Sequence, residues 1–258
     1  MLFVIDVGNT NTVLGVYEDD RLVKHWRIQT YQGRTSDEHG ILLRELFHFA
    51  GLDPDAISDA IISCVVPPME RALIAMVEDY FEVSPAVVGD SIQPSMPVLY
   101  DNPREVGADR LVNAVAAWQR YHTSLVVVDF GTATTFDAIT TDGAYMGGAI
   151  APGVTVSSEA LFHHASKLPR VDIAKPPSVI GQTTVNSIQS GLLYGYTGLV
   201  REIVTRMKEE LGAGTRVVAT GGLAHIIARE TDIIDEVDNF LTLEGLRLIY
   251  DEHNETPQ

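Results

Sequence analysis

The pattern of apolar and polar positions predicts a chain in which strands and helices alternate. Short apolar runs rich in Val, Ile and Leu are too brief for helices and are typical of buried strands. Longer segments with apolar residues three and four positions apart predict helices that bury one face. In the first half, the expected strands are residues 2–7, 13–17, 22–28, 60–66 and 86–88. Helices are expected after Ser36 as N-cap, ending at Gly51, and from Pro67 to Phe81.

The second half repeats this order of elements. Its expected strands are residues 125–129, 136–140, 145–150 and 216–220, with helices at about 154–166 and 184–211. A further helix, from about Pro103 to Tyr121, joins the halves, with Asp101 or Asn102 as its N-cap and proline at its first position. The repeated order indicates internal duplication, with a first half at residues 1–118, a second at 119–258 and a ligand cleft between them.

Each half opens with the same short pattern, an apolar strand that ends in Asp and a turn that contains Gly. Glycine permits a positive φ and keeps side chains away from the turn amides, while the carboxylate suits a cation beside phosphate oxygens. One copy alone is ordinary turn chemistry, but two copies after buried strands indicate phosphate-binding turns. Aligned at a constant offset, the equivalent pairs are Asp6 and Asp129, Gly8 and Gly131, and Thr12 and Thr135.

Composition narrows the class of partner. The 258 residues are 45% hydrophobic and 21% charged, as in a soluble globular protein. A formal net charge of −17 argues against nucleic acid and acidic membranes as partners. The apolar N-terminal stretch is interrupted by Asp6 and lacks a basic start, so we expect no signal peptide, and no apolar run is long enough for a membrane span. The single cysteine, Cys64, fits a cytoplasmic location.

The two Asp-bearing turns, together with the later pair Gly221-Gly222, resemble the acetate kinase, sugar kinase, chaperone and actin superfamily. That resemblance implies an α/β fold of two ribonuclease H-like halves with ATP between them and the glycine pair near the adenosine. Within the superfamily, the chain is identified as a member of the type III pantothenate kinase family over essentially its whole length. The patterns that carry this resemblance are Asp6–Thr12, Tyr100–Pro103, Gly107–Arg110 and Asp129–Thr135.

The family resemblance implies transfer of the ATP γ-phosphate to the primary hydroxyl of pantothenate, the first step toward coenzyme A, in a homodimer that uses Mg-ATP. It assigns Asp109 as the proton acceptor and Asp129 as the ligand of a monovalent cation, K⁺ or NH₄⁺. The implied ATP-binding residues are Asp6, Val7, Gly8, Asn9, Thr10, Asn11, Thr12, Val13 and Thr132. The implied pantothenate-binding residues are Tyr100, Gly107, Ala108, Asp109, Arg110 and Thr184.

The residues themselves are compatible with this chemistry but leave alternatives open. No Gly-Lys pair of a P-loop occurs, so the turn amides, hydroxyls and a cation must hold the phosphates. Asp109 could accept the alcohol proton while Arg110 neutralises anionic charge, or both could lie on a solvated helix face. Tyr100 could equally be a packing residue, and Thr184 a helix cap.

Two other functions remain possible from the sequence. Another small-molecule kinase of the superfamily, such as a sugar kinase, would keep both Asp-bearing turns but use a different acceptor-binding segment. A non-catalytic nucleotide-binding regulator, or an assembly ATPase of the actin type, would not need Asp109. The glycine spacing at Gly191, Gly195 and Gly198 indicates close helix packing, either within the chain or across a subunit interface.

Overall fold

A computed structural model describes residues 1–255, and it divides into two compact units. Unit 1 comprises residues 1–95, 102–116 and 241–255; unit 2 comprises residues 96–101 and 117–240. Neither unit is continuous in sequence, and residue 118, where we expected the boundary, lies inside a helix. The cleft expected between the halves stays a prediction.

Unit 1 is built on a five-stranded sheet in the order β3-β2-β1-β4-β5. The neighbours β1–β2 and β2–β3 are antiparallel, whereas β1–β4 and β4–β5 are parallel. The strands are β1 (Leu2–Val7), β2 (Asn11–Glu18), β3 (Arg21–Gln29), β4 (Asp59–Cys64) and β5 (Ala86–Val87). The helices are α1 (Ser36–Ala50), α2 (Pro67–Phe81) and α7 (Leu241–Glu255), with a 3₁₀ turn at Pro54–Ala56.

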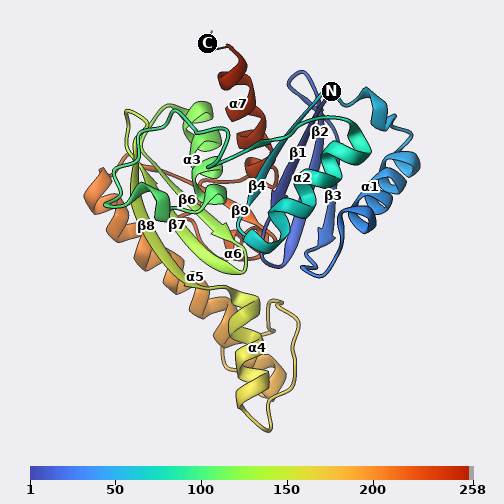
Figure 1. The fold of residues 1–258 in the computed structure, drawn as a ribbon. Helices are drawn as coiled ribbons and strands as arrows, with labels where there is room; N and C mark the ends of the chain where they lie inside the picture. Colours follow the sequence, from blue (N-terminus) through green and yellow to red (C-terminus); the bar gives the residue numbers. More distant parts are fainter. Residues whose placement is uncertain (256–258) are drawn as a thin grey trace. The chain divides into compact units, whose positions relative to one another are not determined.

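The core of unit 1 lies between the sheet and the pair α1 and α2, which Figure 1 shows side by side. Phe3 on β1 meets Phe47 of α1 edge-on at 5.4 Å between ring centroids and Phe81 of α2 at 5.1 Å. The opposite face of the sheet is covered by α7, because Leu243 lies beside Gly15 of β2. The C-terminal helix therefore completes the fold of unit 1 from the far end of the chain.

Unit 2 repeats the same sheet, in the order β10-β9-β6-β7-β8. The pairs β6–β7 and β7–β8 are antiparallel, and β6–β9 and β9–β10 are parallel. The strands are β6 (Leu125–Phe130), β7 (Ala133–Ile139), β8 (Tyr145–Pro152), β9 (Arg216–Gly221) and β10 (Glu236–Val237). The helices are α4 (Val154–His164), α5 (Thr184–Leu211) and α6 (Ala224–Ala228), and Figure 1 shows α4 and the first turns of α5 extending beyond the sheet.

Strand pairing confirms the duplication and corrects its alignment. Asp6 pairs with Val13 across the first hairpin, but Asp129 pairs with Thr135 across the second, so the first turn is one residue longer. Thr12 therefore corresponds to Thr134, and its predicted equivalence to Thr135 is wrong. Alignment of the two halves at a constant offset gave the wrong pair because the first turn has one extra residue after its glycine. The pattern of apolar residues does not show this insertion.

The joining helix is not continuous, which corrects the expected span from Pro103 to Tyr121. Asn102 accepts a hydrogen bond from the amide of Arg104 and begins a 3₁₀ turn at Pro103–Glu105. The chain then passes through Val106 and Gly107 before α3 begins, and α3 covers Ala108–Tyr121. The break sets the start of α3 at the Gly107–Arg110 segment, where a helix has amides without intrahelical partners.

Two helix N-caps lie one residue before the positions expected from the sequence. The N-cap of α1 is Thr35 rather than Ser36, and its hydroxyl forms a capping box with Glu38. The N-cap of α5 is Thr183, whose hydroxyl accepts from the amide of Asn186, so the alternative of Thr184 as the cap is wrong. Among residues 1–255, no helix is long and apolar enough to cross a bilayer.

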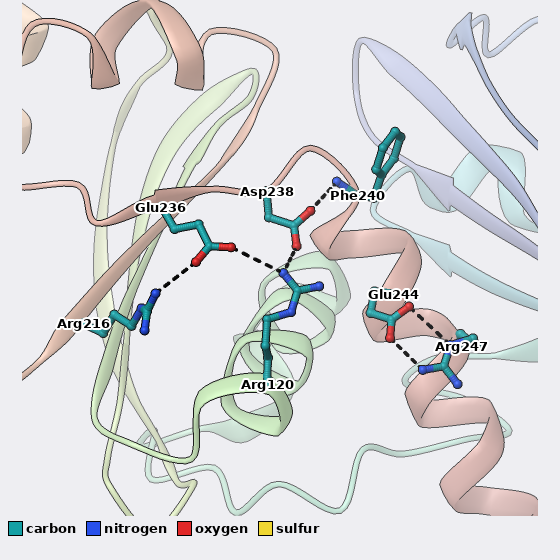
Figure 2. Close-up of polar contacts among 7 residues, drawn as sticks. All are labelled: Arg120, Arg216, Glu236, Asp238, Phe240, Glu244 and Arg247. Carbon is teal, nitrogen blue, oxygen red and sulfur yellow. Dashed lines mark hydrogen bonds and ion pairs between the residues drawn. The ribbon is translucent and has the colours of Figure 1, made fainter. Parts of the chain in front are cut away.

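The C-terminal end of α3 is fixed in unit 2 by charged side chains (Figure 2). Arg120 pairs with Asp238, and Glu236 lies 3.9 Å from Arg120 and 3.0 Å from Arg216. The Arg216 guanidinium also stacks over the ring of Tyr121 at 4.2 Å. Because several charges and a ring form one network, these contacts hold α3 better than isolated surface pairs would.

His39 is a buried titratable group outside the turns. Its side chain is 1% exposed, and neither ring nitrogen has a hydrogen-bond partner among the described residues. Burial, followed by the nearby charge of Arg34, lowers the pKa of His39 from its usual 6.5. The imidazole is therefore neutral in the folded protein at neutral pH.

We expect His39 to make the fold acid-sensitive. Below pH 6.5, His39 is protonated in the unfolded chain more readily than in the folded chain, where its pKa is lower. The free energy of unfolding therefore falls as pH falls. Urea midpoints at pH 7.5 and 5.5 should differ less in His39→Leu than in the wild type. The matched control is His253→Leu at an exposed position. An unchanged pH dependence in His39→Leu would contradict this account.

Candidate active site

The first turn follows β1, and Asp6 is the next-to-last residue of that strand. Residues 3–5 are completely buried, whereas Asp6 is partly exposed. The amide of Gly8 donates to the carbonyl of Asn11 at 3.1 Å, which closes the turn between β1 and β2. A Cβ at Gly8 would lie 3.0 Å from that carbonyl, so the turn suits glycine. Asn9 and Thr10 are exposed at its tip.

Asp109 occupies the first turn of α3 and is largely shielded from solvent. Its Oδ1 accepts a hydrogen bond from the amide of Arg110 at 2.8 Å. Burial raises the pKa of Asp109, although this amide and the Arg110 charge act in the opposite direction. A raised pKa makes a carboxylate a stronger proton acceptor while leaving it able to ionise.

Gly107 is required beside Asp109 for steric reasons. A Cβ at Gly107 would lie only 2.6 Å from the Asp109 Oδ1 atom, so alanine would displace the carboxylate. The neighbouring Arg110 side chain is 8% exposed, which rejects the alternative that the Asp-Arg pair lies on a solvated helix face. A buried arginine next to a partly buried aspartate at the start of a helix is a candidate functional site.

The Asp6 and Asp109 segments meet through Val65, just after β4. The Val65 amide donates to the carbonyl of Val7 at 3.1 Å, and its side chain lies 3.9 Å from the Cβ position of Gly107. Because β1 and β4 are parallel, both strands end at this edge of the sheet. Unit 1 therefore brings the first turn and the Gly107–Arg110 segment to the same end of its sheet.

In unit 2, Asp129 lies one residue before the end of β6 and is partly exposed, as Asp6 is in β1. Its Oδ1 is 2.5 Å from the position that a Cβ on Gly221 would take and 3.7 Å from that on Gly131. Gly221 also has a φ of 92°, which disfavours other residues. Two glycines thus leave space around this carboxylate. We find no group of three or more His, Cys, Asp or Glu in residues 1–255 that could hold a metal ion.

The second turn packs closely against Gly153, the residue that follows β8. Thr132 is exposed, and its carbonyl accepts from the amide of Gly153 at 3.0 Å. A Cβ at Gly153 would lie 2.3 Å from that carbonyl oxygen and 2.6 Å from the carbonyl oxygen of Gly131. The tight approach keeps the Thr132 segment at the end of β6, close to Asp129.

Tyr100 and Thr184 both lie in unit 2. The ring of Tyr100 is 3.4 Å from the Cβ position of Gly147 on β8. The β8 residue that lies level with Thr135 and Asp129 is Ile150, three residues further along the strand. Thr184 is the exposed first residue of α5. Unit 2 by itself therefore does not bring Tyr100 to Asp129.

The sequence analysis did not single out two side chains beside the first turn. Thr30, directly after β3, makes hydrogen bonds to that turn. Ser63 is in register with Asp6 on the adjacent strand, is completely buried, and its hydroxyl has no partner among the described residues. Nothing in the local sequence distinguishes either residue. The pairing of β3 with β2 brings Thr30 to the first turn, and the pairing of β4 with β1 brings Ser63 beside Asp6.

Comparison with solved structures identifies the fold first. The chain superposes on a candidate 2-dehydro-3-deoxygalactonokinase from Sinorhizobium meliloti with a TM-score of 0.61 at 12% identity, covering 100% of this chain and 98% of the other. A candidate Baf family transcriptional activator from Campylobacter jejuni gives a TM-score of 0.62 at 17% identity, covering 98% and 100%. The predicted α/β fold of two ribonuclease H-like halves, shared with sugar kinases, is confirmed.

Sequence comparison then identifies the family. The type III pantothenate kinase family model matches residues 2–206. A type III pantothenate kinase of Myxococcus xanthus is 58% identical over 97% of this chain and 98% of its own length. One from Geobacter sulfurreducens is 58% identical over 99% and 100%. The chain belongs to the type III pantothenate kinase family, as its four motifs predicted.

Proposed function

We propose that this chain transfers the γ-phosphate of ATP to the primary hydroxyl of pantothenate, giving 4'-phosphopantothenate for coenzyme A synthesis. The observation that carries the proposal is the partly buried Asp109 at the same end of the unit 1 sheet as the Asp6 turn, in a chain 58% identical to a type III pantothenate kinase over nearly its full length. The proposed location is the cytoplasm, where ATP is available and the lone Cys64 stays reduced.

An acceptor panel tests this function directly. Purified protein with Mg-ATP should phosphorylate pantothenate and leave glucose, glycerol and acetate unreacted, as measured by ADP release and by mass of the product. Reactions without acceptor report background ATP hydrolysis. Preferred phosphorylation of glucose or glycerol would instead support another kinase of the same superfamily, and ATP binding without any turnover would support a nucleotide-binding regulator.

The first turn is assigned to the ATP phosphates. Amides and hydroxyls from Asp6 to Val13 can donate to phosphate oxygens at the end of β1, and Thr132 is the proposed contact from the second turn. The divalent cation, Mg²⁺, neutralises phosphate charge when bound. In residues 1–255, Asp6 has no cluster of further acidic ligands around it, so nucleotide oxygens and water would complete the shell. Mg²⁺ typically binds in this way, through one or two carboxylates.

Asp109 is the proposed general base. As the pantothenate oxygen forms its bond to the γ-phosphorus and the bond to ADP breaks, the hydroxyl proton moves to the Asp109 carboxylate. The raised pKa of Asp109 favours this step, and the Arg110 amide holds the carboxylate in place. The buried Arg110 guanidinium neutralises anionic charge near the acceptor. Tyr100, Gly107, Ala108 and Thr184 complete the proposed pantothenate contacts.

Replacing Asp109 by Asn should separate chemistry from binding. The amide keeps the size but cannot accept a proton, so kcat should fall by about 10²- to 10⁴-fold while the ATP dissociation constant stays near the wild-type value. Steady-state kinetics and calorimetry measure the two effects. Asp90→Asn, at an exposed turn position, is the matched control. Near-normal turnover in Asp109→Asn would remove Asp109 from the base role.

Asp129 is the proposed ligand of a monovalent cation. The space left by Gly131 and Gly221 around its Oδ1 is compatible with an ion held by one carboxylate, neighbouring carbonyls and hydroxyls. One carboxylate with neutral carbonyl and hydroxyl oxygens carries a low negative charge, which suits a monovalent cation. Such an ion would offset the repulsion between ATP and a protein of net charge −17.

Activity should therefore need K⁺ or NH₄⁺ in addition to Mg²⁺ and should be poor in Na⁺, which is too small for the same cage. The measurement is turnover in Mg²⁺ with K⁺, NH₄⁺, Na⁺ or no added monovalent cation, at constant ionic strength set with a large organic cation. Asp129→Asn should lose the stimulation by K⁺. Equal rates under all four conditions would limit Asp129 to ordering its own turn.

A homodimer is the proposed assembly state. Large apolar side chains are exposed on α4, the segment after it and the start of α5: Val156, Leu161, Phe162, Val179, Ile180 and Val185. On α5, a Cβ added at Gly191, Gly195 or Gly198 would meet no atom within 4 Å, so these glycines form no notch against their own chain. An exposed apolar region of this kind, next to a smooth helix face, is typical of a subunit interface.

Light scattering should give the mass of a dimer for the wild type. Ile180→Glu, at a position that is 83% exposed, should shift the protein toward a monomer because a charge would enter the apolar contact. Phe49→Glu is the matched control, since Phe49 is 82% exposed on α1, which belongs to the other unit. A fully active wild-type monomer would exclude the proposed assembly.

A further inference from the structure

We propose that Thr30 is a positioning residue that holds the first phosphate turn in its ATP-binding conformation. The inference rests on the proposed kinase function. Thr30 follows β3, on the side of β2 away from β1. Its amide donates to the Thr10 carbonyl at 3.0 Å, and its hydroxyl donates to the Gly8 carbonyl at 2.7 Å. The hydroxyl of Thr12 lies 3.0 Å from the same Thr30 oxygen and can donate to it.

These bonds fix the direction of two peptide groups in the turn. In a planar trans peptide, the carbonyl and the following amide point in opposite directions. Because the carbonyls of Gly8 and Thr10 point at Thr30, the amides of Asn9 and Asn11 point away from it. Thr30 thus fixes the orientation of these two amides, with their N–H groups on the side of the turn away from it. Backbone amides held in fixed directions in a turn can form an anion-binding concavity.

The corresponding turn in unit 2 has no side-chain hydroxyl in the place of Thr30. Strand pairing makes Gly153 the counterpart of Thr30, because Gly153 donates to Thr132 as Thr30 donates to Thr10. Thr134, the counterpart of Thr12, is completely buried, and its hydroxyl has no hydrogen-bond partner among the described residues. The hydroxyl tie is therefore specific to unit 1 and is not a general requirement of this hairpin.

The presence of the Thr30 hydroxyl bonds in unit 1 and their absence in unit 2 agree with the different lengths of the two turns. The second turn is short enough to be pressed against Gly153, where any Cβ would collide with carbonyl oxygens. The first turn carries one more residue, and the Thr30 hydroxyl binds its Gly8 carbonyl. The extra residue lengthens the row of amides available to phosphates, and Thr30 removes the conformational freedom that the longer turn would otherwise have.

The test removes only the hydroxyl. Thr30→Val keeps the shape and the amide bond to Thr10 but loses the tie to Gly8 and Thr12. Loss of about one such hydrogen bond should raise the dissociation constant and KM of Mg-ATP about tenfold, with the KM of pantothenate unchanged. Thr30→Ser should restore ATP affinity. Thr140→Val is the matched control, because the Thr140 hydroxyl accepts from the amide of Ala144 in a different turn.

Calorimetric titration with Mg-ADP, which needs no turnover, gives an independent measurement. Hydrogen exchange of the Asn9 and Asn11 amides should also be faster in Thr30→Val than in Thr30→Ser. Wild-type ATP affinity and exchange in Thr30→Val would overturn the positioning role. Equal loss in Thr30→Val and Thr140→Val would assign the effect to general destabilisation and also overturn it. If the wild type binds ATP but phosphorylates no pantothenate, the proposed function fails, while the ADP titration still decides the role of Thr30.

Discussion

The structure depends on one constraint, that the central strand of each sheet is buried on both faces. Residues 3–5 of β1 and 125–128 of β6 are completely shielded, so a charge is tolerated only where each strand reaches the edge of the sheet. Asp6 and Asp129 are at that edge, one residue before their strands end. The strand core thus holds each carboxylate on a rigid base, and the turn after it supplies backbone amides at the same place. The proposed phosphate site and the proposed cation site both rest on this arrangement.

Close backbone approach then sets the details around the carboxylates. Gly107 leaves room for the Asp109 carboxylate, and Gly221 does so for Asp129, because a Cβ at either glycine would lie within 2.6 Å of a carboxylate oxygen. Burial raises the pKa of Asp109, which suits its proposed role as the acceptor of an alcohol proton.

Duplication supplied two similar turns, and small differences have given them different properties. The first is longer, is bonded to the Thr30 hydroxyl and shares its sheet edge with Asp109. The second is shorter, lies against Gly153 and has the buried Thr134 hydroxyl in place of a tied one. One inserted residue and one side chain on the third strand account for this divergence. The assignment of ATP phosphates to one turn and a monovalent cation to the other is consistent with it.

By itself, the sequence determined the order of strands and helices, the duplication, the paired Asp-x-Gly turns and the family. These features are local: strand and helix periodicity, and short motifs, are readable within a few residues. Only the tertiary structure decided the register that aligns Thr12 with Thr134, the break before α3, the burial of Arg110 and the placement of α7 in unit 1. The sequence analysis also missed Thr30 and Ser63, because only strand pairing brings Thr30 to its hydrogen-bond partners and Ser63 beside Asp6. The physical reason is that pairing and burial depend on residues distant in sequence, whose contacts no local pattern records.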